Sequence, residues 1–87
     1  MEYVDPCNYI REYYKIPIFI GMRVEIGYMI EPWGKRKIAT TGSITGASHY
    51  VHVLLDGEKN TRRFHPTSMI TYFNLDGSVA AQFGDED

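Results

Sequence analysis

The sequence predicts an all-β fold, a small five-stranded barrel with a short N-terminal α-helix. Apolar and polar residues alternate with a period of two in "MRVEIGYMI" (residues 22–30) and in "YVHVLLDG" (residues 50–57), which is the pattern of half-buried strands. Asp56 and Gly57 form a strong reversal signal, because this pair tolerates the positive φ that hairpin turns require. The connections are too short for the helical crossovers of a parallel sheet, so we expect antiparallel strands.

Length and composition indicate one globular domain. A chain of 87 residues has room for one modest core, and its 44% hydrophobic and 23% charged residues are typical of a folded domain. The net charge of −2 argues against a dedicated duplex-DNA binder, which needs many cations to neutralise phosphates. We expect residues 1–75 to form the barrel with its helix. Residues 76–87 are expected to form a C-terminal extension with a partly disordered acidic tail, in which residues 79–83 fit either a short helix or a packing strand.

The helix is expected within "VDPCNYIREYYKIP" (residues 4–17). Asp5 is a suitable N-cap, and Pro6 has the fixed φ that suits the first helical position. Pro17 disfavours helix at the residue before it and so ends the helix. A helix this short does not persist alone in water, so we expect its tyrosine face to pack on the barrel. That face comprises Tyr9, Tyr13 and Tyr14.

The strands follow one another through connections of different kinds. After the first strand, "EPWGKRK" (residues 31–37) contains Pro32, Gly34 and three successive cations, so it is predicted to be a long irregular loop. Further strands are expected at residues 38–47, 50–55, 61–64 and 70–73, with one helical turn at residues 65–69. This order of short antiparallel strands and connections is typical of SH3-like barrels, which include the KOW and Tudor groups.

Two segments, "YYKIPIFIGMRVEI" (residues 13–26) and "GSITGASHYVHVLLDGEKNTRRFHPTSMITYF" (residues 42–73), resemble a group of small proteins encoded in bacteriophages and prophages. The "FHPT" sequence, together with the spacing of the glycines, is the most specific part of the resemblance. The resemblance implies a barrel and a phage-type setting, in the cytoplasm of a bacterial host, and it supplies no catalytic residues. A looser resemblance to KOW segments rests on Gly42, Ile44 and the Asp56-Gly57 turn, but the chain lacks the denser lysine and arginine of ribosomal members.

The candidate partner-binding residues lie around the predicted loop. Trp33 offers a stacking surface there, and the cations beside it offer donors to an acidic protein or to a nucleic acid. These cations are Lys35, Arg36 and Lys37. Tyr28 lies beside the loop, and Arg63 lies on the cationic strand after the Asp-Gly turn, so both are included in the site. An alternative stays open, in which Trp33 folds back over an open barrel end and the cations are solvated.

Catalytic and metal-binding motifs are missing from the sequence. Its serine, histidine and aspartate residues are scattered, and none stands in a nucleophile context. His49 and His52 are three residues apart, which places them on opposite sides of a strand, and no cysteine pair accompanies them. We therefore expect no enzyme activity, no metal and no cofactor. Cys7 is interpreted as a packing residue, and His65 as a residue that hydrogen-bonds to backbone.

The function expected from the sequence is that of a non-enzymatic, phage-type accessory or regulatory protein. The expected partner is a host or viral protein, bound through the aromatic and cationic loop. The alternative is a KOW- or Tudor-like nucleic-acid-binding module. No apolar run approaches the roughly 20 residues of a membrane span, so no membrane contact is expected. A homo-oligomer is compatible with the sequence, but no signature requires one.

Overall fold

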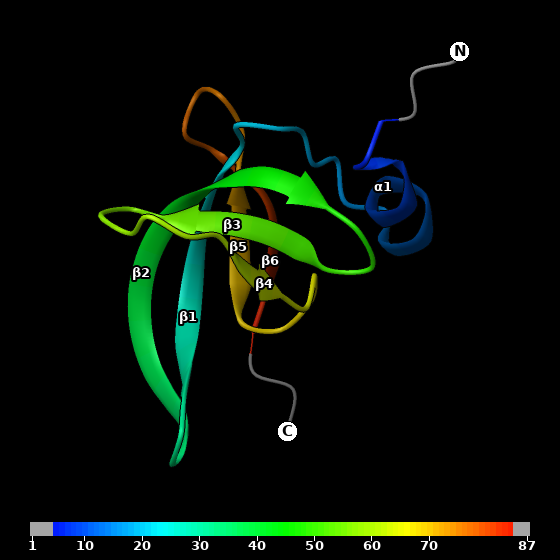
Figure 1. Cartoon of the computed structure of the whole chain (residues 1–87). Helices are drawn as coiled ribbons and strands as arrows, with labels where there is room; N and C mark the ends of the chain where they lie inside the picture. Colours follow the sequence, from blue (N-terminus) through cyan, green and yellow to red (C-terminus); the bar gives the residue numbers. More distant parts are fainter. Residues whose placement is uncertain (1–4, 85–87) are drawn as a thin grey trace.

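A computed structural model of the chain shows one antiparallel sheet and one short helix (Figure 1). The structure describes residues 5–84, and of residues 29–31 and 35–38 it describes the backbone alone. In chain order the elements are α1 (Asn8–Tyr14), β1 (Arg23–Glu31), β2 (Gly34–Ala47), β3 (Val51–Leu55), β4 (Arg62–Phe64), β5 (Ile70–Phe73) and β6 (Val79–Phe83). The prediction of an all-β fold with a short N-terminal helix is confirmed.

Neighbouring strands of the sheet are all antiparallel, in the order β4-β3-β2-β1-β5-β6. β1 to β4 form a meander, while β5 returns to pair with β1 and β6 adds to β5. β2 is long and curved, so that β3 and β4 cross over the face of β1, β5 and β6 (Figure 1). Within the described residues the pairings leave β4 and β6 as edges. The sheet is therefore open and six-stranded, which differs from the predicted closed barrel of five strands.

One apolar core lies between the two halves of the curved sheet. Val24 and Ile26 of β1 are fully buried, and so are Val51 and Val53 of β3, which confirms the period-two pattern that predicted these strands. The same cluster includes, from other segments, Ile16, Ile18, Met22, Ile44, Leu55, Phe64, Ile70 and Tyr72. Because both halves contribute to one cluster, the core closes only if β2 curves.

Two glycines allow the chain to bend where the strands approach closely. At Gly42, a Cβ would lie 2.7 Å from the carbonyl oxygen of Leu54 and 2.8 Å from Cγ1 of Val53. A side chain there would push β2 away from β3. Gly27 lies at the register shift of β1, and its N–H donates a 2.8 Å hydrogen bond to the carbonyl oxygen of Met69.

α1 packs on the core through Cys7 and Ile10, whose side chains are fully buried. The interpretation of Cys7 as a packing residue is confirmed. The predicted packing of the tyrosine face holds for Tyr14, which is partly buried against the core. It is wrong for Tyr9 and Tyr13, which are 41% and 67% exposed. The compact Cys7 and the branched Ile10 fill the contact, so these two rings remain on the surface.

Arg11 ties α1 to the segments on both sides of it. Its Nε–H donates a 2.7 Å hydrogen bond to the carbonyl oxygen of Ile18, and its guanidinium pairs with the carboxylate of Asp5. Asp5 also accepts a 2.9 Å hydrogen bond from the backbone N–H of Cys7, so it caps the turn before the helix. The helix begins at Asn8, with Cys7 rather than Asp5 at the N-cap. These bonds fix the orientation of the helix and thus of its exposed tyrosines.

The segment predicted to be a long loop, residues 31–37, is a tight hairpin. β1 extends to Glu31 and β2 begins at Gly34, so the turn contains Pro32 and Trp33 alone. Pro32 supplies a fixed φ, and Gly34 adopts a φ of 133°, which together reverse the chain within two residues. The hairpin projects beyond the rest of the sheet (Figure 1).

Two later segments complete the comparison with the predicted elements. Residues 65–69 form a hydrogen-bonded turn rather than a helical one, in which the N–H of Ser68 donates to the carbonyl oxygen of His65 at 3.3 Å. Within the predicted C-terminal extension, Val79–Phe83 is β6, so the packing-strand alternative is correct. The acidic residues 85–87 of the predicted tail lie outside the described residues.

An exposed ion pair joins the start of β1 to the residue after β3, and Thr41 of β2 adds a hydrogen bond to it. Arg23 donates two hydrogen bonds to the carboxylate of Asp56, at 2.9 and 2.5 Å, and the hydroxyl of Thr41 donates a third at 2.6 Å. These bonds hold the pKa of Asp56 well below its ordinary value, and the bond from Arg23 is the largest cause. Solvent and salt screen exposed charges, so the ion pair adds modestly to stability.

Asp56→Asn is expected to lower the midpoint of urea unfolding at neutral pH. Because the pKa of Asp56 is depressed in the folded chain, its stabilisation is fully present above the unfolded pKa of about 3.9 and is lost as the pH falls through the folded value. The difference between the variant and the parent chain should therefore shrink in acid. Glu25→Gln, at an exposed carboxylate of β1, is the control. Equal pH dependence of the two variants would contradict the assignment.

Gly42→Ala is expected to destabilise the fold by about 1–3 kcal/mol, because the added methyl group would meet the backbone of β3. Gly46→Ala is a matched control in the same strand, since a Cβ there meets the ring of His52 at an ordinary 3.4 Å. Both variants remove the same flexibility from the unfolded chain, so the difference between their free energies of unfolding isolates the close approach. Equal urea midpoints would show that the approach is not a constraint.

Candidate partner-binding site

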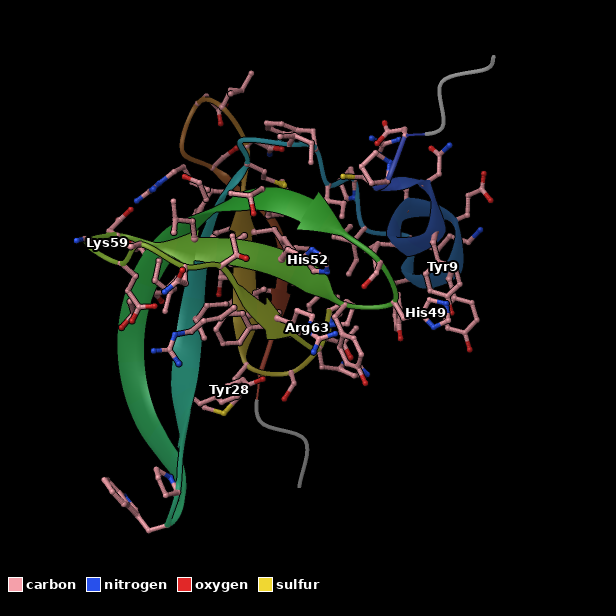
Figure 2. All side chains as sticks on the ribbon, in the orientation of Figure 1. Tyr9, Tyr28, His49, His52, Lys59 and Arg63 are labelled. Atoms are coloured by element: carbon pink, nitrogen blue, oxygen red, sulfur yellow. The ribbon has the colours of Figure 1, made fainter. Side chains whose placement is uncertain are left out.

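A surface hollow of about 390 Å³, which we call the Arg63 pocket, is lined among the described side chains by residues from four segments. Tyr28 comes from β1, Tyr50 from the turn before β3, Arg63 from β4 and His65 from the turn after β4. In Figure 2, Tyr28 lies beside the lower part of β1, and Arg63 lies above it at β4. Since β4 is an edge strand, the pocket lies at the open side of the sheet.

Tyr28 forms the fixed base of the pocket. The residue is 6% exposed, and its ring packs edge-on against Phe64 with the centroids 5.8 Å apart. Its hydroxyl interacts with Ser68 and with the backbone of His65, and burial raises the pKa of the phenol above its ordinary value. Tyr28 is therefore a neutral group held by the turn between β4 and β5, rather than the surface residue that the sequence predicted.

His65 has its ring orientation set by Thr67. The backbone N–H of Thr67 donates to Nδ1 of His65 at 3.2 Å, and the Thr67 hydroxyl lies 3.1 Å from the same atom. Because a backbone N–H can only donate, Nδ1 is an acceptor and the neutral ring carries its hydrogen on Nε2. The predicted hydrogen bond between His65 and the backbone is confirmed, with the ring nitrogen as the acceptor. It leaves the Nε2 hydrogen as the donor that this ring can present to a ligand.

A buried hydrogen bond supports the turn that carries His65. The hydroxyl of Tyr72 donates to the carbonyl oxygen of Pro66 at 2.7 Å. Tyr72 is fully buried in the core, and this burial raises the pKa of its phenol far above the ordinary value. The hydroxyl therefore stays protonated and keeps donating, so the core itself holds the turn in place.

Arg63 is the exposed cation of the pocket. Strand alternation places it on the opposite side of β4 from the buried Phe64, and it faces His52 across the ladder. The adjacent Arg62 differs, because it donates to both carboxylate oxygens of Glu58, at 2.7 and 3.1 Å. Among the residues that the structure describes, no carboxylate pairs with Arg63.

A row of ring contacts extends from the pocket to α1, and we call it the aromatic strip. Its members are Tyr9, Tyr13, Tyr14, His49, Tyr50 and His65. Tyr9 stacks on Tyr13 and on His49 with centroid separations of 5.4 and 4.5 Å, and Figure 2 shows Tyr9 and His49 side by side. His65 contacts the rings of Tyr14 and Tyr50 edge-on, at 5.9 and 6.5 Å. The strip therefore joins the helix to the pocket through side-chain contacts.

The structure separates the residues that the sequence grouped into one site. Tyr28 and Arg63 share the pocket. Trp33 is 81% exposed at the tip of the β1–β2 hairpin, so it does not fold back over the core. β1 ends three residues beyond Tyr28, so roughly 10 Å of strand and then the turn separate Trp33 from Tyr28. Lys35, Arg36 and Lys37 belong to β2, but their side chains lie outside the described ones.

Sequence reasoning missed most of the aromatic strip. The sequence predicted helix packing for Tyr9 and Tyr13 and a hydrogen bond to backbone for His65. It assigned no role to Tyr50, and it considered His49 only as a metal ligand. The available signal was the excess of tyrosine, seven in 87 residues, which is more than a core this small can bury. Spacing could not reveal the contacts, because Tyr9 and His49 are forty residues apart and meet only in the fold.

The described part of the chain contains no candidate metal-binding cluster and no candidate membrane-spanning helix. No group of three or more histidine, cysteine, aspartate or glutamate side chains among residues 5–84 could hold a metal ion. The helix described here is far shorter and more polar than a bilayer-crossing helix, and the described residues contain no other candidate.

Comparison with known proteins assigns no family to the chain. No protein-family model, curated protein or solved structure matches it. The function is therefore inferred from the geometry and charge of the pocket and the strip.

Tyr72→Phe is expected to lower the free energy of unfolding by about 1–2 kcal/mol, because the carbonyl oxygen of Pro66 loses its donor in a buried place. Tyr13→Phe, which removes a hydroxyl from a residue that is 67% exposed, is the matched control and should be close to neutral. Urea unfolding of both variants measures the difference. If Tyr72→Phe were as stable as Tyr13→Phe, the hydrogen bond would not support the turn.

Proposed function

We propose that the chain is a non-enzymatic accessory protein that binds another protein through the aromatic strip and the Arg63 pocket. The observation that supports this proposal is the row of ring contacts from the exposed, stacked Tyr9 and Tyr13 to the Arg63 pocket. The arginine of this pocket has no carboxylate partner among the described residues. Tyrosine and arginine are enriched at the centres of protein interfaces. Rings that already pack on one another lose little conformational entropy when a partner binds.

Several rings of the aromatic strip are exposed enough to contact a partner protein. Tyr9, Tyr13 and Tyr50 are 41%, 67% and 45% exposed, so each presents part of a ring to solvent. Tyr9 and Tyr13 also line a second hollow, of about 310 Å³, together with Glu12. An aromatic surface flanked by hollows on both sides suits the side chains of a folded partner or of an extended peptide.

The proposed setting is a phage-type one, in the cytoplasm of a bacterial host, with a host or viral protein as the partner. The support for it is the resemblance of residues 13–73 to small phage and prophage proteins. We also propose that the sheet is SH3-like in plan. The meander of β1 to β4 and the return of β5 to β1 support that reading, with β6 as an addition at the edge.

The hairpin tip is proposed as a second contact point on the same partner. Trp33 is the most exposed aromatic side chain among the described residues, and the cations of β2 follow it in the sequence after Gly34. A tryptophan held on a projecting turn can insert into a pocket of a partner. Its distance from the Arg63 pocket requires a partner that spans both.

Single-stranded nucleic acid is the second candidate ligand. Tyr9 and Tyr13 lie nearly parallel, with 7° between their planes, and this geometry also accepts a stacked base. The two candidates differ in their dependence on salt. Binding of a nucleic acid should weaken steeply as salt is added, whereas an interface anchored by aromatic rings should lose far less affinity.

Tyr50→Ala is expected to weaken partner binding by roughly 2 kcal/mol, as for an interface anchor, and to leave the fold intact because Tyr50 is 45% exposed. The immobilised chain would be incubated with bacterial extract, with and without nuclease treatment, from cells with and without an induced prophage. The retained proteins would be identified by mass spectrometry. The affinity of a purified retained protein for each variant is then measured.

The control for this experiment is Leu75→Ala, which removes an apolar side chain that is 91% exposed in the turn between β5 and β6. Trp33→Ala in the same assay tests the hairpin tip. Proteins retained equally by the parent chain, Tyr50→Ala and Leu75→Ala would refute the proposed surface. Loss of all retained material on nuclease treatment would favour the nucleic-acid candidate.

A further inference from the structure

The Arg63 pocket has the charge of an anion site. Its described lining contains a cation, a histidine and two tyrosines, and no carboxylate. Among the arginines whose side chains the structure describes, Arg11, Arg23 and Arg62 each pair with a carboxylate of the chain, and Arg63 does not. A shortage of carboxylates cannot explain this, because the chain has 11 acidic residues against 9 lysines and arginines.

The donors of the pocket suit one planar anion. The guanidinium of Arg63 presents parallel N–H groups that match the two oxygens of a carboxylate. His65 can add a donor, since Thr67 occupies its Nδ1 and leaves the hydrogen on Nε2. Tyr28 and Tyr50 supply ring surface on which the carbon atoms next to a carboxylate can pack.

The surroundings of the pocket disfavour a long polyanion. Glu12 lines the second hollow at the other end of the aromatic strip, so a phosphate backbone that followed the strip would meet a carboxylate there. The net charge of the chain is −2, which also opposes a partner that carries many negative charges. A single carboxylate next to an apolar or aromatic group does not reach Glu12, and its one charge is little affected by the net charge of the chain.

We infer that the Arg63 pocket binds a carboxylate of the partner protein, with an aromatic or apolar residue next to it seated on the aromatic strip. The carboxylate is an aspartate or glutamate side chain or the end of the partner chain, because both present the same two oxygens. This inference rests on the proposed function and specifies its partner chemistry.

A display library of random short peptides, selected on the full chain, tests this inference. The expected binders carry aspartate, glutamate or a free C-terminus beside an aromatic or apolar residue. Replacing the acid by its amide, or amidating the C-terminus, identifies which source of carboxylate is bound. The loss of affinity expected from that change is about tenfold or more, as for a charge-assisted hydrogen bond.

Arg63→Gln should weaken the selected acidic peptide by about tenfold or more and should make its acid and amide forms bind equally. Arg62→Gln is the matched control, since it removes the adjacent arginine, which pairs with Glu58, and it should change affinity by less than about twofold. The far-ultraviolet circular dichroism spectrum of each variant checks the fold. An oligothymidylate of similar length, titrated in parallel, tests the nucleic-acid candidate.

A library without acid-dependent binders, or peptides whose affinity falls equally in Arg62→Gln and Arg63→Gln, would overturn the carboxylate assignment. Oligothymidylate binding that depends on Arg63 and exceeds that of the peptides would also overturn it. These failures are separable from failure of the proposed function. Binding of a retained protein could depend on Tyr50 while binding of every peptide is independent of Arg63. That result would support the interface and refute the carboxylate site.

Discussion

The curvature of β2 is the constraint on which the rest of the structure depends. Its early residues pair with β1 and its later residues pair with β3, so one strand belongs to both halves of the sheet. The close approach at Gly42 keeps the backbones of β2 and β3 together within this curve. With a straight β2, Tyr28 of β1 and Arg63 of β4 would lie three strands apart on one flat sheet. The pocket is thus a product of the same bend that closes the core.

The strands were largely predictable from the sequence, and the way they assemble was not. Alternation in residues 22–26 and 51–55 predicted both the strands and their buried sides, because burial of one face leaves a local pattern of period two. The proline, glycine and cations of residues 31–37 suggested a loop, yet Pro32 and Gly34 instead serve a turn of two residues within a long hairpin. The return of β5 to β1 depends on pairing between segments far apart in the sequence, which leaves no local trace. β6 pairs with β5 across the short turn that contains Asp76 and Gly77, and the residues of β6 alone fitted either a helix or a strand.

The candidate site was predictable in part, and for reasons that can be stated. Tyr28 and Arg63 were selected as an aromatic and a cationic residue near a loop, and the fold does bring them together, although Tyr28 is nearly buried. The contacts of His49 and His65 with tyrosines depend on where α1 packs. That position follows from Cys7 and Ile10, so the packing of two apolar side chains decides where the exposed rings lie.

The net charge of the chain bears on the binding of long nucleic acids, whereas the local charge decides what the Arg63 pocket can bind. A net charge of −2 argues against long nucleic acids, but exposed charges are screened beyond about 8 Å at physiological salt, so it says little about one pocket. What matters locally is that Arg62 is neutralised by Glu58 while Arg63, on the other side of the same strand, is not neutralised by any described carboxylate. Because side chains alternate along β4, Arg62 lies on one side, where it pairs with Glu58, and Arg63 lies on the other, where it is available to a partner.

The shortness of β4 also decides how a partner can be recognised at this edge. A partner strand could add to β4 only over Arg62–Phe64, which offers few unpaired backbone groups and so little affinity from a strand added in register. Recognition at this side of the molecule must then come from side chains that project from the edge and from the turn after it. Those side chains are Arg63 and His65, and the buried bond from Tyr72 to Pro66 holds their supporting turn to the core. The β4 edge of the open sheet thus offers hydrogen-bond donors from side chains, rather than a long strand to which a partner strand could pair.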